Sequence, residues 1–425
     1  MDGSKELRTS RPRKPARRAT RVGAQPATAQ RPSLDGVLQL LWRERQISRA
    51  EIARRTGLSR STVSEIVGEL LKTRLVAEVG DGPSQGGRRP IVLQFQDDAY
   101  AVLGIDLGAA HVSVALANLR GQLIAWEHRS HPVRTDPEGA ASLMEELSEA
   151  CLRQWKLGTD RLVGIGVAVP SPVDPRNPDR VSDTVMPAWQ GHNVGGALRA
   201  RFRVPVFVDN DANLAALAEH WWGAGRGIDD FTYVKVATGV GAGHIIRGQI
   251  FRGAHGIAGE IGHLAIDPKG ELCICGLRGC LATRVGSRAL VARASALLPE
   301  FPGSALAGRE VTITAIEDAA LVGDPLALKV VGEAADYLGI AVAGMLNMMN
   351  PARVIIGGGL ARLGELLLSA IRRSVGNRTL LSSIDPTEIV TGELGARAVA
   401  IGAATLVLQT ALADLRHFRT AAARS

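Results

Sequence analysis

The sequence has few aromatic residues, few cysteines and no long apolar run. Its 425 residues include six tryptophans, three tyrosines, seven phenylalanines and four cysteines. So few cysteines exclude the disulfide framework of a small secreted protein. The most apolar stretch, residues 338–349, is interrupted by glycine and asparagine and is shorter than the ~20 residues of a membrane-spanning helix. The N-terminus lacks the apolar core of a signal peptide. We therefore expect a cytoplasmic protein with no membrane partner.

The positive charge is concentrated at the N-terminus. The composition is otherwise that of an ordinary globular protein, with 46% hydrophobic and 22% charged residues. Residues 1–32 hold nine basic and two acidic side chains, and residues 33–95 hold ten and seven, whereas the remainder is close to neutral. This asymmetry is typical of a polyanion-binding segment attached to a neutral body. A basic tail that is merely solvated explains the first segment equally well, and residues 1–32 have no period that would predict ordered structure.

Residues 33–95 have the pattern of a winged helix-turn-helix. A first apolar stripe of helical period is followed by Ser48 and Glu51, which fit a capping box at the start of a second helix. That helix is expected to end near Gly57, because glycine suits the left-handed C-terminal position. Ser59 then caps a third helix. Two short helices joined by such a turn are typical of DNA-binding proteins.

A basic hairpin follows the third helix and predicts the wing. Residues 76–79 and 91–95 are expected to be strands, and the intervening loop contains two arginines between glycine and proline. Arginines held in this way suit a narrow minor groove, whereas the start of the third helix suits the major groove. A solvated basic hairpin is the alternative. The residues expected to contact double-stranded DNA are Arg60, Ser61, Thr62, Ser64, Arg88 and Arg89.

From residue 100 onward the pattern is α/β and contains an internal echo. Residues 101–117 predict a strand, a glycine turn and a second strand, and residues 231–246 repeat this arrangement. The echo indicates a duplicated body of two lobes with a cleft between them. Such glycine turns can bind phosphate through backbone N–H groups, although hairpins also use them without any ligand.

A cluster of cysteines predicts a metal site. Cys273, Cys275 and Cys280 lie within eight residues, and His263 lies ten positions before the first of them. Three thiolates and one imidazole form the ligand set of a closed tetrahedral zinc site, which leaves no position for a catalytic water. A disulfide is the competing interpretation, disfavoured by the expected compartment. Cys151 stands apart in a helical pattern and is expected in the core.

Polar residues near this cluster and at one strand end predict a ligand site. Glu260 precedes His263 by three residues, so a bound metal would orient it. Asn210 and Asp211 follow an apolar strand at residues 204–208, where carboxylates and amides can accept hydrogen bonds from sugar hydroxyls. Helix N-capping is the alternative role for Asp211.

Together these motifs resemble the ROK family, which includes bacterial sugar-responsive repressors and sugar kinases. The resemblance extends from about Ser33 to the C-terminus. Its most specific parts are Glu260-x-Gly-His263 and the run from Cys273 to Cys280. The supporting matches are Pro170-Ser171-Pro172-Val173-Asp174, Asn210-Asp211-Ala212-Asn213, Gly357-Gly358-Gly359 and, as in the family's regulators, Gly87-Arg88-Arg89-Pro90.

The resemblance implies an α/β fold with an N-terminal winged helix-turn-helix and a two-lobed, ribonuclease-H-like (actin-like, sugar-kinase-type) body. The expected divisions are a disordered basic arm (1–32), the DNA-binding domain (33–95) and the body (96–425). Within the body, lobe 1 covers about 96–212 plus a C-terminal helix at about 398–417, and lobe 2 covers about 213–397. The implied zinc ligands are His263, Cys273, Cys275 and Cys280, and the implied sugar-binding residues are Asn210, Asp211, Glu260 and His263.

The sequence departs from the family's usual pattern at three positions, two in the ATP turn and one beside the last cysteine. The family's kinases use the position of Asp211 as a base and an Asp-x-Gly-Gly-Thr turn for ATP, but here Ala109 and Ala110 replace the last two residues of that turn. We therefore expect no catalytic residue and no ATP. Ala282 replaces a glutamate that usually contacts the sugar, so the pocket is expected to accept an unusual sugar, to bind weakly, or to have lost its sugar.

These observations predict a zinc-containing, sugar-responsive transcriptional repressor that acts as a homodimer or a dimer of dimers, because paired half-sites match protein symmetry. An ATP-dependent sugar kinase with an appended DNA-binding domain is the main alternative. A regulator controlled by a partner protein rather than by a sugar is the third hypothesis.

Overall fold

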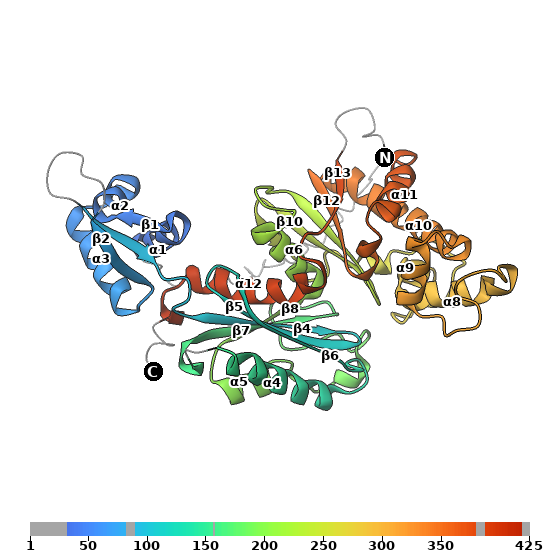
Figure 1. The fold of residues 1–425 in the computed structure, drawn as a ribbon, viewed down its shortest axis with the longest axis horizontal. Helices are drawn as coiled ribbons and strands as arrows, with labels where there is room; N and C mark the ends of the chain where they lie inside the picture. Colours follow the sequence, from blue (N-terminus) through green and yellow to red (C-terminus); the bar gives the residue numbers. More distant parts are fainter. Residues whose placement is uncertain (1–31, 82–89, 156–157, 380–386, 419–425) are drawn as a thin grey trace, which may run out of the picture.

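The computed structural model describes residues 32–81, 90–155, 158–379 and 387–418 (Figure 1). It consists of a winged helix-turn-helix followed by a two-lobed α/β body, so the predicted fold class is confirmed. Residues 1–31 of the expected basic arm lie outside the described residues, as do Arg88 and Arg89 of the expected wing tip.

Residues at the helix ends determine where the helices of the winged domain begin and end. The Ser48 hydroxyl accepts a hydrogen bond from the backbone N–H of Glu51 (3.2 Å), Gly57 ends the helix in the left-handed conformation (φ 71°), and Ser59 caps the next helix in the same way. In a full capping box, the Glu51 side chain would also accept a hydrogen bond from the backbone N–H of Ser48. Instead, the Glu51 carboxylate pairs with Arg54 (2.6 and 2.8 Å). The elements are α1 (Pro32–Glu44), β1 (Gln46–Ser48), α2 (Arg49–Thr56), α3 (Arg60–Lys72), β2 (Val76–Asp81) and β3 (Ile91–Phe95), with the strands in the order β1-β3-β2.

Each lobe of the body is built on a five-stranded mixed sheet, and the two sheets share one topology. In each, three antiparallel strands are followed by two parallel ones, in the orders β6-β5-β4-β7-β8 and β11-β10-β9-β12-β13. The strands of the first sheet are β4 (Ala101–Gly108), β5 (His111–Asn118), β6 (Leu123–Ser130), β7 (Leu162–Val169) and β8 (Val206–Asn210). Those of the second are β9 (Phe231–Val236), β10 (Val240–Ile246), β11 (Gln249–Phe251), β12 (Arg353–Gly357) and β13 (Glu388–Thr391).

Two helices lie between the sheets and hold the lobes together (Figure 1). Helix α12 (Ala398–Leu412) packs against β4 and β7, α6 (Asp211–Trp222) packs against β9 and β10, and the two helices pack against each other. Their contact is so close that a Cβ atom at Gly402 would lie 1.7 Å from the carbonyl oxygen of Leu214, so only glycine fits there. The remaining helices are α4 (Pro137–Arg153), α5 (Gly196–Phe202), α7 (Ala282–Val285), α8 (Ser287–Leu297), α9 (Ile313–Leu321), α10 (Pro325–Met349) and α11 (Glu365–Gly376).

Among the residues that the structure describes, one helical stretch is long and apolar enough to cross a membrane, contrary to expectation. Residues Gly395–Leu412 have a mean hydropathy of 1.4 over 18 residues. Because 67% of this stretch is buried inside the fold, its composition is that of a core helix between two sheets. The expectation for Cys151 is confirmed, since its side chain is fully buried in the core of the first lobe.

Candidate functional site

A cavity of about 750 Å³ lies between the lobes. It is lined by the carboxyl end of β8, by the turn between β9 and β10, and by the loop that follows β11. This is the usual place for a ligand in an α/β fold, where strand ends leave backbone and polar side chains accessible. All four residues expected to bind the sugar line the cavity, namely Asn210, Asp211, Glu260 and His263.

Asn210, rather than Asp211, caps the helix that begins at the cavity. The Asn210 Oδ1 accepts hydrogen bonds from the backbone N–H groups of Ala212 (2.9 Å) and Asn213 (3.2 Å), and its Nδ2 donates to the carbonyl of Ser171 (3.2 Å). The helix therefore begins at Asp211, and the capping role considered for Asp211 is wrong, because Asn210 is the N-cap. The Asp211 side chain is left to face the cavity.

Asp211 forms a buried ion pair with Lys235. The Nζ of Lys235 lies 2.6 Å from Oδ2 of Asp211, and the two side chains are only 15% and 10% exposed. Burial alone would lower the pKa of Lys235, but the charges of Asp211 and then Asp106 hold it above its ordinary value. The lysine therefore remains an ammonium ion that neutralises Asp211. Lys235 could not be identified from the sequence, because nothing in the strand pattern of β9 indicates a partner 24 residues away.

Glu260 and His263 line the cavity from the loop that follows β11. Burial, with a smaller contribution from the charge of Asp211, raises the pKa of Glu260 to about 7. A carboxyl group with this pKa can both donate and accept hydrogen bonds near neutral pH, as a sugar hydroxyl requires of its partners. Its Oε2 lies 4.0 Å from Nε2 of His263.

The other ring nitrogen of His263 faces the cysteine cluster. Its Nδ1 lies 3.6 Å from Sγ of Cys273, Cys275 and Cys280 have their sulfur atoms 3.7 Å apart, and all four ligand atoms lie within 4.8 Å of one another. A sulfur separation of 3.7 Å excludes a disulfide, whose bond length is about 2.05 Å. Metal bonds of about 2.3 Å to sulfur and 2.0 Å to nitrogen place tetrahedral ligands about 3.5 to 3.8 Å apart. The two distances of 3.6 and 3.7 Å therefore match a tetrahedral metal site, and all four ligand atoms lie close enough together to surround one ion.

The loop around this cluster is shaped by a tight turn, a required glycine and an ion pair. Cys273 donates its backbone N–H to the carbonyl of Leu277 (2.7 Å), which closes a tight turn between the cysteines. Gly279 has a positive φ of 65°, and a Cβ atom there would lie 1.5 Å from the carbonyl oxygen of Asp267. An ion pair between Asp267 and Arg284 (2.7 Å) joins the loop to α7. The loop is therefore held in shape on both sides of the cluster.

The turn between β4 and β5 corresponds to the expected phosphate turn. The His111 Nε2 lies 3.1 Å from Oδ2 of Asp106, and the imidazole ring packs against Gly108. Burial alone would raise the pKa of Asp106, but the hydrogen bond to His111 and the charge of Lys235 keep it below its ordinary value. Ala109 lines the cavity beside this turn, and Ala282, the first residue of α7, also lines it.

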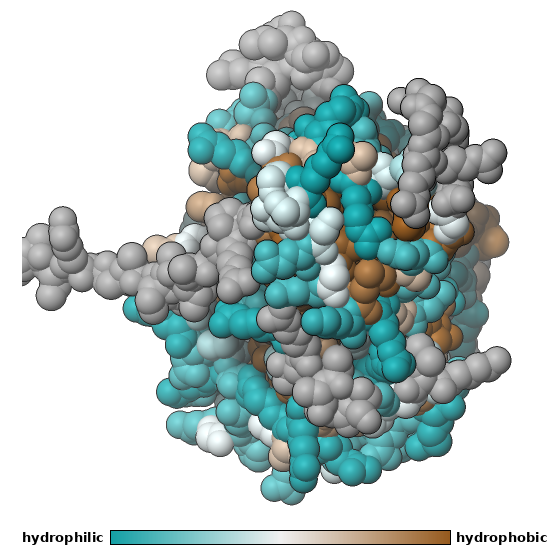
Figure 2. Space-filling view, turned by 90° about the vertical axis from the view of Figure 1, so that its left-hand side faces the viewer, coloured by the Kyte–Doolittle hydropathy of each residue, from teal (hydrophilic) through white to brown (hydrophobic). Residues whose placement is uncertain are grey.

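The expected DNA-binding side chains lie at the start of α3. Arg60, Ser61 and Ser64 are exposed, whereas Thr62 is half-buried. The hydroxyl of Ser59 lies 2.8 Å from those of both Ser61 and Thr62, so the cap also orients these two side chains. Figure 2 shows that this end of the molecule is mainly hydrophilic, as a surface that contacts phosphates must be.

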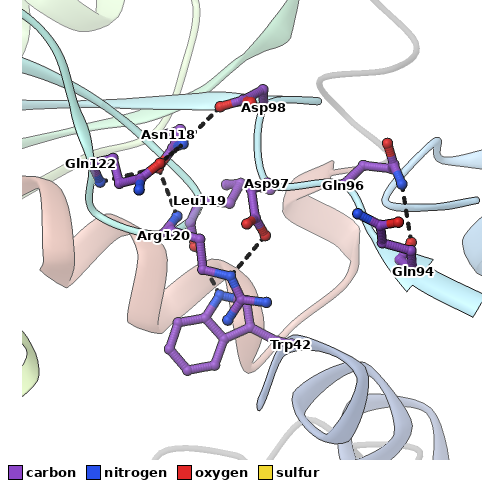
Figure 3. Close-up of polar contacts among 9 residues, drawn as sticks. All are labelled: Trp42, Gln94, Gln96, Asp97, Asp98, Asn118, Leu119, Arg120 and Gln122. Atoms are coloured by element: carbon purple, nitrogen blue, oxygen red, sulfur yellow. Dashed lines mark hydrogen bonds and ion pairs between the residues drawn. The ribbon is translucent and has the colours of Figure 1, made fainter. Parts of the chain in front are cut away.

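The winged domain is joined to the body through Trp42 of α1 (Figure 3). The indole N–H donates to the carbonyl of Leu119 (2.8 Å), and the guanidinium of Arg120 lies 4.8 Å from the indole centroid while pairing with Asp97 (2.7 Å). On its other side, Trp42 contacts the end of α6, with ring centroids 5.5 Å apart from Trp221. The helix that starts in the cavity therefore ends against the DNA-binding domain.

Comparisons with known proteins agree with this geometry. Residues 102–410 match the model of the ROK family, and residues 36–76 match a winged helix-turn-helix DNA-binding model. The xylose repressor of Caldicellulosiruptor bescii is 33% identical over 384 residues, which cover 88% of this chain and 95% of the repressor. The DNA-binding transcriptional dual regulator NagC of Escherichia coli is 34% identical over 368 residues, covering 86% and 89% of the two chains. A crystal structure of a ROK family transcriptional regulator, a homologue of the E. coli MLC protein, superposes with a TM-score of 0.75 at 27% identity, covering 92% of this chain and 98% of the other.

Proposed function

This chain belongs to the ROK family, and we propose that it is a cytoplasmic transcriptional repressor of carbohydrate metabolism genes, gated by a sugar or sugar derivative bound between its lobes. The observation that carries this proposal is the course of α6. The helix begins at Asp211 in the cavity and ends at Trp222, against the DNA-binding domain. The names of the repressors that match nearly the whole chain support the same function.

The route from ligand to DNA is proposed to run along α6. At about 1.5 Å per residue, its 12 residues span about 18 Å. A ligand that contacts Asn210 and Asp211 would act on the start of α6, and Trp42 contacts the end of the same helix. For the ligand to change DNA affinity, it must bind one arrangement of the two domains more tightly than the other.

The DNA-binding surface is proposed to be the start of α3 in the major groove, with the wing arginines Arg88 and Arg89 in the minor groove. The side chains for the major groove are Arg60, Ser61, Thr62 and Ser64. A homodimer or dimer of dimers would place two such surfaces on paired half-sites, and the basic arm of residues 1–32 would add affinity that falls with salt.

We assign Zn²⁺ to the cluster of His263, Cys273, Cys275 and Cys280. The thiolates and imidazole suit this ion, and the ligand separations fit a tetrahedron. Because all four positions are taken by protein, the ion would be structural. It would hold His263 beside Glu260 and so shape the sugar-binding wall.

Phosphoryl transfer is not part of the proposed function. A base at the position of Asp211 must accept a proton, but Lys235 binds one of its carboxylate oxygens, and this ion pair makes the carboxylate a weaker base. Ala109 and His111 line the cavity at this turn, and the His111 ring packs against Gly108, so both side chains reduce the space for a phosphate there. These features favour a ligand-binding cleft over the alternative of a sugar kinase.

Fluorescence anisotropy on DNA from the gene's own upstream region tests the proposal, with competitor DNA and a panel of sugars. We expect specific binding that one sugar alters. Replacement of Arg60 by alanine should weaken specific binding by about tenfold or more, as loss of a base or phosphate contact does. Arg129→Ala, an exposed change in the body, serves as the control. Specific binding that no sugar alters would favour a regulator controlled by a partner protein, and absence of specific binding would refute the proposal.

Replacement of Trp42 by alanine tests the route of coupling. The variant should still bind sugar and DNA, but the effect of sugar on DNA affinity should fall from about tenfold to less than about threefold, since couplings of 1–3 kcal/mol depend on such contacts. Calorimetry measures the affinity for the sugar, and anisotropy measures the affinity for DNA without and with the sugar. Trp155→Ala, in a half-buried tryptophan of the first lobe, is the matched control. Full coupling in Trp42→Ala would exclude this route.

A further inference from the structure

Two arginines line the cavity without a partner. Arg134 lies between β6 and α4, and Arg288 lies in the first turn of α8. Neither forms a hydrogen bond or ion pair with any residue that the structure describes, and the Nε of Arg134 is buried without an acceptor. The other cationic side chains of the cavity are paired, because Lys235 binds Asp211 and Arg362 binds Glu317 (3.0 Å).

An unpaired, partly buried guanidinium is costly, so its position needs a reason. Burial lowers the pKa of Arg134, and the like charge of Arg288 lowers it further. The nearby charge of Asp211 is already neutralised by Lys235. The backbone before Arg134 is fixed, since the carbonyl of Val133 accepts a hydrogen bond from the indole of Trp189 (2.7 Å). The opposite charges near Arg134 are those of Asp211, which is bound to Lys235, and of Cys273 in the cysteine cluster. Neither forms an ion pair with Arg134, so its guanidinium can still bind the oxygens of a ligand.

The cavity wall has no carboxylate at position 282, although Glu260 and Glu271 also line the cavity. Ala282, where the ROK family usually has a glutamate, presents a methyl group to the cavity one turn before α8. A carboxylate there would compete for the arginines and repel an anionic ligand. The same substitution that removes a contact to a neutral sugar thus leaves room for a ligand with negative charge.

We propose that the effector is an anionic sugar derivative, a sugar phosphate or a sugar acid, whose charged oxygens are bound by Arg134 and Arg288 while its hydroxyls meet Asn210 and Glu260. The planar fork of a guanidinium suits two oxygens of a phosphate or carboxylate, which a neutral sugar cannot supply. This inference rests on the proposed function, since it names the class of ligand for the same cavity.

Calorimetric titration of the full-length protein tests the inference with matched compounds. The neutral members are glucose, N-acetylglucosamine and xylose. The anionic members are glucose 6-phosphate, N-acetylglucosamine 6-phosphate, xylose 5-phosphate and glucuronate, with inorganic phosphate as a separate probe. We expect one anionic compound to bind at least about tenfold more tightly than its neutral counterpart, and the phosphate and carboxylate arms to identify the charged group.

Variants of Arg134 test whether this arginine causes the preference for an anionic compound. Arg134→Gln should lower affinity for the anionic compound by about tenfold or more and change affinity for its neutral counterpart less than twofold. Arg134→Lys, which keeps the charge but loses the fork, should lie between these values. Arg153→Gln changes an arginine on the outer helix α4, outside the cavity, and should have no effect.

Four results would overturn the inference. Equal or tighter binding of every neutral compound would do so, as would an equal loss for both classes in Arg134→Gln. If a neutral sugar binds and alters DNA affinity while no anionic compound binds, this inference fails and the proposed function stands. If no compound of either class binds or alters DNA affinity, both fail.

Discussion

Replacement of Cys275 by serine is expected to abolish metal binding. Metal analysis should give about one zinc per wild-type chain and almost none in the variant, because serine is a poor ligand for an ion held by thiolates. The half-buried Cys275 is the most accessible of the three clustered thiols, so the substitution disturbs packing little. Without the ion, the sulfur atoms of the two remaining cysteines would lie close together with no metal to bind them.

The stability of the second lobe should fall with the metal. Loss of a structural metal is among the changes that cost about 4 kcal/mol or more, and each kcal/mol lowers the Tm of a lobe of this size by about 2 to 4 °C. We therefore expect a Tm lower by about 8 to 16 °C, measured by scanning calorimetry. Sugar affinity should fall as well, because His263 belongs to both the metal cluster and the wall of the cavity.

The fourth cysteine provides the control. Cys151→Ala removes a thiol that lies in the core of the first lobe and touches no residue of the cluster, so its zinc content should equal that of the wild type. Titration of thiols in the wild-type protein, after denaturation in chelator, should find all four cysteines in the reduced form. A wild-type protein without metal, or a metal-free variant of unchanged stability, would contradict the assignment.

The metal cluster could be predicted from the sequence because its ligands are close along the chain. His263 and Cys280 are separated by 17 residues, and a loop of that length can surround an ion with few alternatives. The caps at Ser48 and Ser59 and the turn at Gly57 were predictable for the same reason, since each depends on contacts within one helical turn.

Features that depend on distant residues could not be predicted. The strand β1 has only three residues and exists because it pairs with β3, 46 positions further along in the pair Ile47 and Leu93. The ion pair of Lys235 and Asp211 joins a strand and a helix whose relative placement no local pattern specifies. The choice of Asn210 over Asp211 as the cap was ambiguous because both residue types cap helices well.

Helix α6 connects these distant features, and its sequence gives no hint of the connection. Its start lies at the cavity, its alanine-rich middle packs against α12, and its last two residues meet Trp42. Trp222 also donates its indole N–H to the hydroxyl of Thr405 in α12 (2.8 Å). A helix tied to ligand, core and DNA-binding domain can transmit a displacement only if its end is firmly anchored in the second lobe.

Glu219 provides that anchor, and its replacement by alanine is expected to destabilise the body strongly. Its side chain is fully buried, and its carboxylate accepts backbone N–H groups from Ala224 (2.8 Å), Glu393 (3.2 Å) and Leu394 (3.1 Å). Each orphaned buried N–H costs about 1–3 kcal/mol, so Glu219→Ala should lower the free energy of unfolding by about 4 kcal/mol. Urea denaturation followed by circular dichroism measures the change.

Two further variants separate the hydrogen bonds from the loss of volume. Glu219→Gln keeps the size and one acceptor oxygen but turns an amide donor toward the backbone donors, so it should cost about 2 kcal/mol. Glu310→Ala, in an exposed loop, should change stability by less than about 0.5 kcal/mol. If Glu219 anchors α6, the glutamine variant should also reduce the effect of sugar on DNA affinity while both ligands still bind. A glutamine variant with wild-type stability and full coupling would show that α6 moves without this anchor.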